Sequence, residues 1–358
     1  MRKSFAWLIC MVFVYVLICA SSDNYMKWLT KQRSNQPEIL TSDKYTFGDL
    51  YGFSFLPQFR FKTVLPNYLP LEKIHHQNGK LDFYILGDSY LYSFFDKKTE
   101  YFANTRSLSF TRWTENIAID PKKLKSSNSV LLVECVERNA FSRLKLPEIT
   151  TRIGFAQSKN TSIASIPKSD YTLSVESINE WIKGRFYHPN LETNLDFVLF
   201  SRGVYRLFKE WKASLNLYFF NRTDNFVVLS KDASFLYLKE TVDSTQISSS
   251  FYPYSNQELD EFVTNLNEIN DYYLKAGFKK VLISIPANPV AILQTEEIPT
   301  NDLLNRLKNH PSLKVEIVDP SDSLKVNASQ NYFKSDSHWN NNGAKIWLAY
   351  INRSLEKI

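Results

Sequence analysis

Apolar residues beyond position 80 fall into short, largely uninterrupted runs. Such a run predicts a strand that is buried on both faces of a sheet, because a strand with one face in water would alternate apolar and polar residues. Stretches of helical periodicity separate the later runs, so strands and helices alternate along the chain. The predicted strands cover residues 83–86, 129–136, 279–286 and 315–318.

The clearest helix signal is the capping box Ser255-Asn256-Gln257-Glu258, in which a serine and a glutamate satisfy each other's backbone N–H groups. Apolar residues then recur at helical spacing until Gly277, a residue type that commonly ends helices. Further helices are predicted at 302–309 and 344–355, the last with Asn342 as its N-cap. Together these elements predict an α/β fold with a doubly wound, mostly parallel sheet flanked by helices in three layers, as in flavodoxin-like proteins.

Residues 145–255 interrupt this alternation and predict an inserted subdomain or cap within a domain that spans 81–358. Within the insertion, apolar segments flank a polar turn over residues 226–238, a pattern typical of a β-hairpin. A cap of this kind shapes substrate access, and Ser201-Arg202-Gly203 is a candidate for the lip of a cleft. For any single aromatic residue of the insertion, packing in the subdomain's own core is the favoured explanation.

Residues 1–22 have the pattern of a targeting segment. Arg2 and Lys3 precede an uncharged apolar run at 5–20, which is short for a membrane span of about 20 residues. The segment therefore predicts either a cleaved signal peptide or an uncleaved membrane anchor, and both place the rest of the chain outside the cytoplasm. Residues 23–80 are polar and aromatic with scattered prolines, which predicts a linker followed by a collar against the main domain.

The composition is that of an ordinary globular protein, with 22% charged residues and a net charge of +6. The basic residues form no block, so nucleic acid is not an expected partner, and a mild attraction to anionic surfaces is all that this charge supports. Cys10 and Cys19 lie in the N-terminal apolar run. Cys135 is then the only cysteine of the main domain, which predicts a buried thiol and no internal disulfide.

Two short motifs carry the chemistry. Asp336 stands two residues before His338 on a predicted loop, where its carboxylate can hold the Nδ1–H group and leave Nε2 free to take a proton. Ser89 stands where the first predicted strand ends and a helix begins, so its hydroxyl is expected at the carboxyl edge of the sheet, beside helical N–H groups that can receive an oxyanion. Together they predict a Ser-His-Asp catalytic triad.

Other polar residues are expected to face the same cleft, because ligands of open α/β sheets bind beyond the carboxyl ends of the strands. Arg138 and Asn139 follow one predicted strand, and Asn288 follows another. Arg138 and Asn139 are candidate donors to an oxyanion, although an ion pair between Arg138 and Glu137 explains that stretch equally well. Trp339 can stack on a sugar ring, with packing beside the final helix as the favoured alternative.

Gly87-Asp88-Ser89 and Asp336-Ser337-His338-Trp339-Asn340 resemble the first and last motif blocks of the SGNH hydrolase superfamily, and the second motif is similar to the alginate O-acetyltransferase branch. The resemblance spans about residues 80 to 355 and implies the SGNH fold with an acyl-serine mechanism. It departs from the superfamily where a Gly-x-Asn-Asp block supplies an oxyanion donor, because Glu137-Arg138-Asn139 stands at the corresponding place.

This resemblance favours an exported acyltransferase that moves an acetyl group onto a hydroxyl of an extracytoplasmic polysaccharide. It implies a periplasmic location and, as a partner, a multi-pass membrane acyltransferase that supplies the acetyl group. A carbohydrate esterase with the same triad and a catalytically silent polysaccharide-binding or scaffolding module remain alternatives. No cofactor or metal is predicted, since His75 and His76 lie beside a turn and lack the further ligands of a zinc site.

Overall fold

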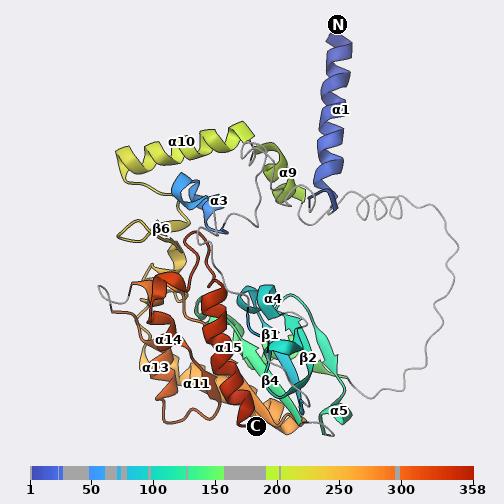
Figure 1. The fold of residues 1–358 in the computed structure, drawn as a ribbon, viewed down its shortest axis with the longest axis vertical. Coiled ribbons are helices and arrows are strands. Elements are labelled where there is room, and N and C mark those ends of the chain that lie inside the picture. Colours follow the sequence, from blue (N-terminus) through green and yellow to red (C-terminus); the bar gives the residue numbers. More distant parts are fainter. Residues whose placement is uncertain are drawn as a thin grey trace, which may run out of the picture. The chain divides into compact units, whose positions relative to one another are not determined.

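A computed structural model describes residues 2–22, 24–26, 48–60, 71–73, 79–95, 98–125, 128–156, 191–200, 203–294 and 299–358. The chain forms two compact units, Met1–Phe61 with Lys159–Thr223, and Lys62–Ser158 with Asp224–Ile358. The described part of the first contains helices and no strand, and we call it the helical unit. The second carries the main sheet, and we call it the sheet unit (Figure 1).

The sheet unit is built on five strands in the order β2-β1-β4-β8-β9, and every neighbouring pair is parallel. Counted along the chain within this sheet, the order is 2-1-3-4-5, as in flavodoxin-like doubly wound sheets. The predicted α/β fold with a mostly parallel sheet is therefore confirmed. The strands are β1 (Leu81–Gly87), β2 (Thr105–Arg112), β4 (Asn128–Glu134), β8 (Lys280–Ser284) and β9 (Glu316–Val318).

The described part of the sheet unit also contains 3-10 turns and helices. The 3-10 turns lie at Thr99–Tyr101, Lys239–Thr241 and Ala328–Gln330. The helices are α4 (Ser89–Phe95), α5 (Pro121–Lys125), α6 (Glu137–Arg143), α7 (Leu146–Arg152), α11 (Asn256–Ala276), α12 (Pro289–Leu293), α13 (Leu303–Lys308), α14 (Ser321–Lys325) and α15 (Asn341–Glu356).

Aromatic contacts from β1 show that helices cover both faces of the sheet. The Phe83 ring lies 5.1 Å from that of Phe102, which in turn contacts Phe95 of α4. The next residue, Tyr84, lies 5.4 Å from Phe278 beside the end of α11. Because adjacent strand residues point to opposite faces, α4 and α11 lie on opposite sides of the sheet.

Local sequence signals account for the ends of the two longest helices of the sheet unit. Ser255 and Glu258 form the predicted capping box of α11, and Gly277 ends the helix at a φ of 118°. The N-cap of α15 is Asn340 instead of the predicted Asn342, because the Asn340 side chain accepts the N–H groups of Asn342 and Gly343. The asparagine that caps the helix therefore directly follows the Asp-x-His-Trp segment.

The predicted β-hairpin is confirmed, since β6 (Val227–Leu229) and β7 (Leu236–Leu238) pair antiparallel. The Leu236 N–H donates to the Lys334 carbonyl at 2.9 Å, which ties the hairpin to the loop that carries Asp336. A separate two-stranded parallel sheet joins β3 (Ile117–Ile119) to β5 (Ile153–Phe155). The hairpin and β5 both belong to the sheet unit, although both lie within the predicted insertion.

The helical unit contains α1 (Arg2–Ala20), α3 (Tyr51–Ser54), α9 (Leu191–Phe200) and α10 (Gly203–Phe220), with a 3-10 turn at Pro57–Phe59. The Asn194 amide of α9 donates to the carbonyl of Ala20 at 2.8 Å. Among the described residues, no helix combines the length and the apolar character that crossing a membrane requires. Ser201, Arg202, His75 and His76 lie outside the described residues, as does much of the predicted linker.

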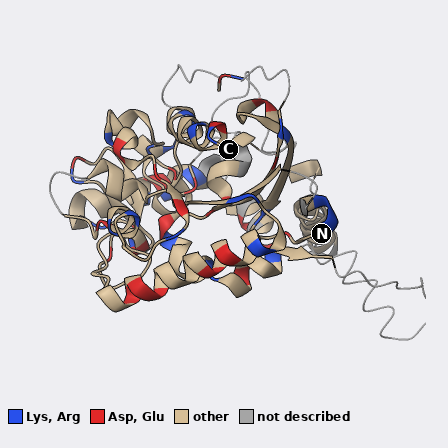
Figure 2. Ribbon diagram, turned by 90° about the horizontal axis from the view of Figure 1, so that it is seen from below, with Lys and Arg blue, Asp and Glu red and all other residues tan. Residues whose placement is uncertain are grey.

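Acidic and basic side chains are interspersed along the described elements (Figure 2). Several of them form ion pairs at the surface of the sheet unit, such as Lys345 with Glu72 at 2.6 Å and Lys280 with Glu316 at 3.0 Å. The arrangement agrees with the even spread of charge along the sequence.

Candidate active site

Ser89 is the first residue of α4 and lies just beyond the carboxyl end of β1. The chain runs from β1 to β2 on one side and later to β4 on the other, so the sheet reverses its order at β1. Crevices at such a reversal are the usual ligand sites of open α/β sheets. Gly87 packs closely here, because a Cβ at this position would lie 3.1 Å from the Phe110 ring and 3.3 Å from the Glu134 carboxylate.

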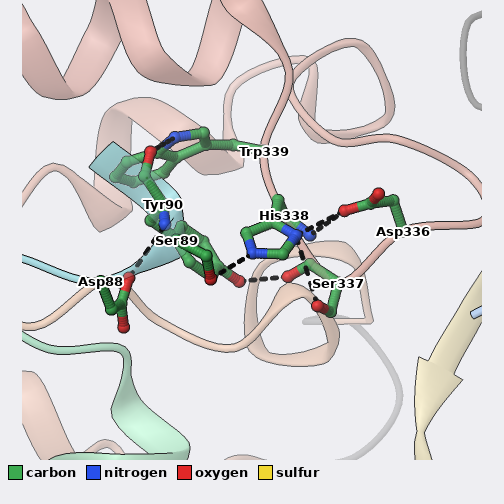
Figure 3. Close-up of polar contacts among 7 residues, drawn as sticks. All are labelled: Asp88, Ser89, Tyr90, Asp336, Ser337, His338 and Trp339. Atoms are coloured by element: carbon green, nitrogen blue, oxygen red, sulfur yellow. Dashed lines mark hydrogen bonds and ion pairs between the residues drawn. The ribbon is translucent and has the colours of Figure 1, made fainter. Parts of the chain in front are cut away.

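The structure joins the three predicted catalytic side chains by hydrogen bonds (Figure 3). Nε2 of His338 lies 2.6 Å from Oγ of Ser89, and Nδ1 of the same ring lies 2.5 Å from Oδ1 of Asp336. The Asp336 carboxylate also accepts the backbone N–H of His338 at 3.1 Å, which fixes the turn between the two residues. The order of contacts is that of a nucleophile, a general base and a carboxylate that orients the base.

Asp88 and Glu134 hold the nucleophile turn against β4. Glu134 accepts the Asp88 N–H at 2.7 Å, and Asp88 in turn accepts the N–H groups of Val136 at 3.0 Å and Tyr90 at 2.9 Å. Burial and the nearby Asp88 charge raise the pKa of Glu134 well above its usual range. The shift favours the protonated form of Glu134, since a neutral carboxyl avoids placing two negative charges side by side in the core.

Tyr90 connects the nucleophile turn to the histidine loop. Its hydroxyl donates to the Ser337 carbonyl, and its own carbonyl accepts the indole N–H of Trp339 at 3.0 Å. The Tyr90 and His338 rings lie 4.8 Å apart. Trp339 is 0% exposed, so the packing alternative is confirmed and the suggestion that this ring stacks on a sugar is wrong.

The other predicted cleft residues have different surroundings. The Arg138 guanidinium lies 5.8 Å from the centre of the Tyr90 ring, which brings a positive charge close to the nucleophile turn. Asn139, the next residue of α6, is half-buried. Asn288 is 0% exposed, and its amide donates to the Ser248 carbonyl and the Ser250 hydroxyl, each at 3.1 Å. Both N–H bonds of that amide are used inside the fold, so the prediction that Asn288 faces the cleft is wrong.

Glu137 lies buried where β4 meets α6. Its carboxylate accepts the N–H of Asn288 at 2.8 Å and the hydroxyl of Ser250 at 3.1 Å. Desolvation raises the pKa of Glu137 to about 7, although these two hydrogen bonds and the Arg138 charge oppose the shift. Glu137 also lines a cavity of about 260 Å³ together with Ala287 and Asp319, which follow β8 and β9.

Sequence reasoning missed Glu134, Asp88 and Tyr90 as the supports of the site. The one available signal was a glutamate inside the apolar run 129–136, because a charged residue in a buried strand needs a specific partner. Cys135, in the same run, is fully buried, and desolvation raises the pKa of its thiol well above the usual range. The thiol is therefore an inert core group, as its sequence context predicted.

Comparisons of the chain with protein-family models, curated proteins and solved structures give no match. The resemblance to the SGNH hydrolases therefore depends on the two short motifs. Independently of the motifs, a hydroxyl, an imidazole and a carboxylate that are hydrogen-bonded in this order can carry out nucleophilic acyl transfer.

Proposed function

We propose that the chain is an exported SGNH-type acyltransferase that moves an acetyl group onto a hydroxyl of an extracytoplasmic polysaccharide. The observation that carries the proposal is the hydrogen-bonded series from Ser89 through His338 to Asp336 at the carboxyl edge of a parallel sheet. The motif resemblance to the alginate O-acetyltransferase branch supports transfer to a sugar. The N-terminal apolar segment supports export.

In the first half-reaction, the Ser89 hydroxyl attacks the carbonyl carbon of an acetyl ester or thioester. His338 Nε2 takes the hydroxyl proton, and the distance of 2.6 Å lies within the reach that general-base catalysis needs. When the tetrahedral intermediate collapses, the bond to the leaving group breaks, and the imidazolium returns that proton to it. Asp336 stabilises the imidazolium while it exists, and the product is an acetyl-serine.

In the second half-reaction, a sugar hydroxyl takes the place of the leaving group. His338 Nε2 removes its proton as its oxygen attacks the acetyl carbon, and the proton then passes to Oγ of Ser89 as the ester is released. If water reaches the acetyl-serine first, the same steps give hydrolysis. Transferase and esterase therefore differ in the acceptor, and the triad is common to both.

Two kinds of donor are available for the oxyanion of the tetrahedral intermediate. The first N–H groups of a helix have no partner within the helix, which makes the Ser89 N–H at the start of α4 one candidate. The second donor in this proposal comes from Arg138 or Asn139 of α6. A contact supports Arg138 in this role, because its guanidinium lies 5.8 Å from the centre of the ring of Tyr90, the residue that follows the nucleophile.

The source of the acetyl group follows from the same resemblance. In the alginate O-acetyltransferase branch a multi-pass membrane acyltransferase commonly passes on the acetyl group, and we propose a partner of this kind. The acceptor is a polysaccharide outside the cytoplasm, and the protein acts in the periplasm.

The test is acetyl transfer by the full chain from a chromogenic acetyl ester, with and without oligosaccharide acceptors. The proposal predicts acetylated oligosaccharide with the wild type and with Ser312→Ala, an exposed control serine, and none with Ser89→Ala or His338→Ala. Acetyl release that acceptors do not alter would identify an esterase. Oligosaccharide binding by all variants, without acetyl release from any of them, would contradict catalysis and leave the silent binding module.

A further inference from the structure

Helix α10 of the helical unit exposes its apolar face and buries its polar face. Arg206 is 2% exposed and Glu210 is 3% exposed, whereas Phe208 is 62% exposed and Trp211 is 65% exposed. Amphipathic helices of globular proteins normally show the reverse, since the apolar stripe packs against the core. Two features of α10 therefore need an explanation: why its polar face is buried, and what covers its exposed apolar face.

The cause is a buried polar cluster around Glu210. Arg60 holds the Glu210 carboxylate with two hydrogen bonds, at 2.8 and 2.5 Å, and the Tyr51 hydroxyl donates to it at 2.5 Å. Arg206 lies one turn earlier, with Nε 3.9 Å from the same carboxylate. Removing a partner from a buried ion pair is strongly destabilising, so this cluster fixes the polar face of α10 against α3 and the turn after it.

The opposite face of α10 carries exposed aromatic side chains near both ends of the helix. Phe208, Trp211 and Tyr218 recur at helical spacing, and Tyr218 is 83% exposed. Phe219 extends the face by one position and is 65% exposed. Exposed apolar side chains gathered on one face mark an interaction surface, whereas scattered ones do not.

The charges on α10 suit a negatively charged partner. Glu210 is the only acidic residue of α10 and is buried, so no carboxylate of the helix is exposed. Lys212 is exposed, and Lys209 is half-buried with its ammonium 4.6 Å from the centre of the Phe55 ring. A helix with aromatic residues on its outward face and only lysine charges beside them complements anionic lipid headgroups.

We propose that α10 lies in the interface of an anionic lipid bilayer, parallel to its surface, with the face of Phe208, Trp211, Tyr218 and Phe219 inserted among the headgroups. The four charged residues of the helix exclude a spanning orientation and suit an interfacial one. Trp and Tyr side chains favour this region because their rings are apolar and their N–H and O–H groups remain hydrated. The inference is independent of the acyl-transfer proposal.

The test measures the environment of single labels on α10 in the full chain. Cys10 is exposed and would react, so Cys10→Ser provides the background, whereas Cys19 and Cys135 are buried. Phe208→Cys and Trp211→Cys each receive an environment-sensitive fluorophore, and Glu268→Cys on the exposed side of α11 provides the matched control. The labelled chains are bound to phosphatidylcholine vesicles with or without phosphatidylglycerol, isolated by flotation, and probed with quenchers placed at headgroup depth.

The proposal predicts that both α10 labels shift to the blue and are quenched, more strongly with phosphatidylglycerol present, while the α11 label stays water-like. Lys212→Gln should lower the interfacial population of α10 about fivefold in the anionic vesicles, the contribution expected of one lysine near the surface. Water-like labels in vesicle-bound chains, or no flotation at all, would overturn the proposal. The same labels are also measured in native membranes; shielding there but not on either kind of vesicle would overturn the proposal as well and would indicate a protein partner.

Discussion

The buried carboxyl of Glu137 should make the stability of the sheet unit depend on pH. The group accepts two hydrogen bonds and lies between the end of β4 and the segment that follows β8. Its pKa rises from the usual 4.5 to about 7 because burial disfavours the charged form. In the unfolded chain, the same side chain is hydrated and titrates near its usual value.

The direction of the change in stability with pH follows from how many protons Glu137 binds in the folded and in the unfolded chain. Between the usual pKa of 4.5 and the folded value of about 7, folded Glu137 holds a proton that the unfolded chain has released. The stabilising contribution is therefore fully present below pH 4.5 and is lost as the pH rises through 7. At about 1.4 kcal/mol per pKa unit, the free energy of unfolding should fall by about 3 kcal/mol across this window.

Glu137→Gln is the variant that isolates this contribution. Its amide oxygen can accept the same N–H and hydroxyl groups, and the side chain does not titrate. Urea unfolding at a series of pH values should give a stability difference between wild type and variant that changes by about 3 kcal/mol across the window. Glu134, whose pKa is also raised, contributes to both curves and cancels in the difference. A difference that does not vary with pH would show that folding does not raise the pKa of Glu137.

Three further outcomes follow from the site and its scaffold. Asp336→Asn should lower kcat for acetyl release about ten-thousandfold with little change in KM, because the imidazole loses its orienting carboxylate; an effect on KM alone would contradict that role. Tyr90→Phe removes the hydroxyl that holds the Ser337 carbonyl, so it should cost about 1 kcal/mol of unfolding free energy and slow turnover; unchanged stability and rate would show that this contact does not position the loop. Ser255→Ala should cost about 1 kcal/mol through the lost N-cap of α11 without changing kcat, as measured by urea unfolding beside the assay.

The central strands and long helices of the sheet unit could be predicted because their signals are local. The apolar runs before Gly87 and at 129–136 became β1 and β4, and the capping box became the start of α11. β2 was not predicted. It is an edge strand whose residues are partly exposed, so its burial does not produce a continuous apolar run. The pairing of β3 with β5 joins short segments far apart in the chain, and no local pattern indicates it.

The residues of the candidate site fall into the same two groups: those with a local sequence signal were predicted, and those without one were not. Ser89, His338 and Asp336 were found because each residue type has a recognised chemical role and stands in a short motif. The supports were missed, since the contact of Asp88 with Glu134 depends on which strand lies beside β1. The prediction for Asn288 failed for a related reason. The predicted strand placed this residue at the carboxyl edge of the sheet, but it could not show which groups of the fold surround its side chain.

Covalent trapping shows whether the Ser89 hydroxyl is an activated nucleophile. The full chain is treated with a fluorophosphonate, which reacts with serines activated by a neighbouring base, and the modified peptide is identified by mass spectrometry. If His338 activates Ser89, an adduct forms on Ser89 in the wild type and none forms in a folded His338→Ala variant. A folded wild type without an adduct, or an adduct that persists in His338→Ala, would contradict that activation.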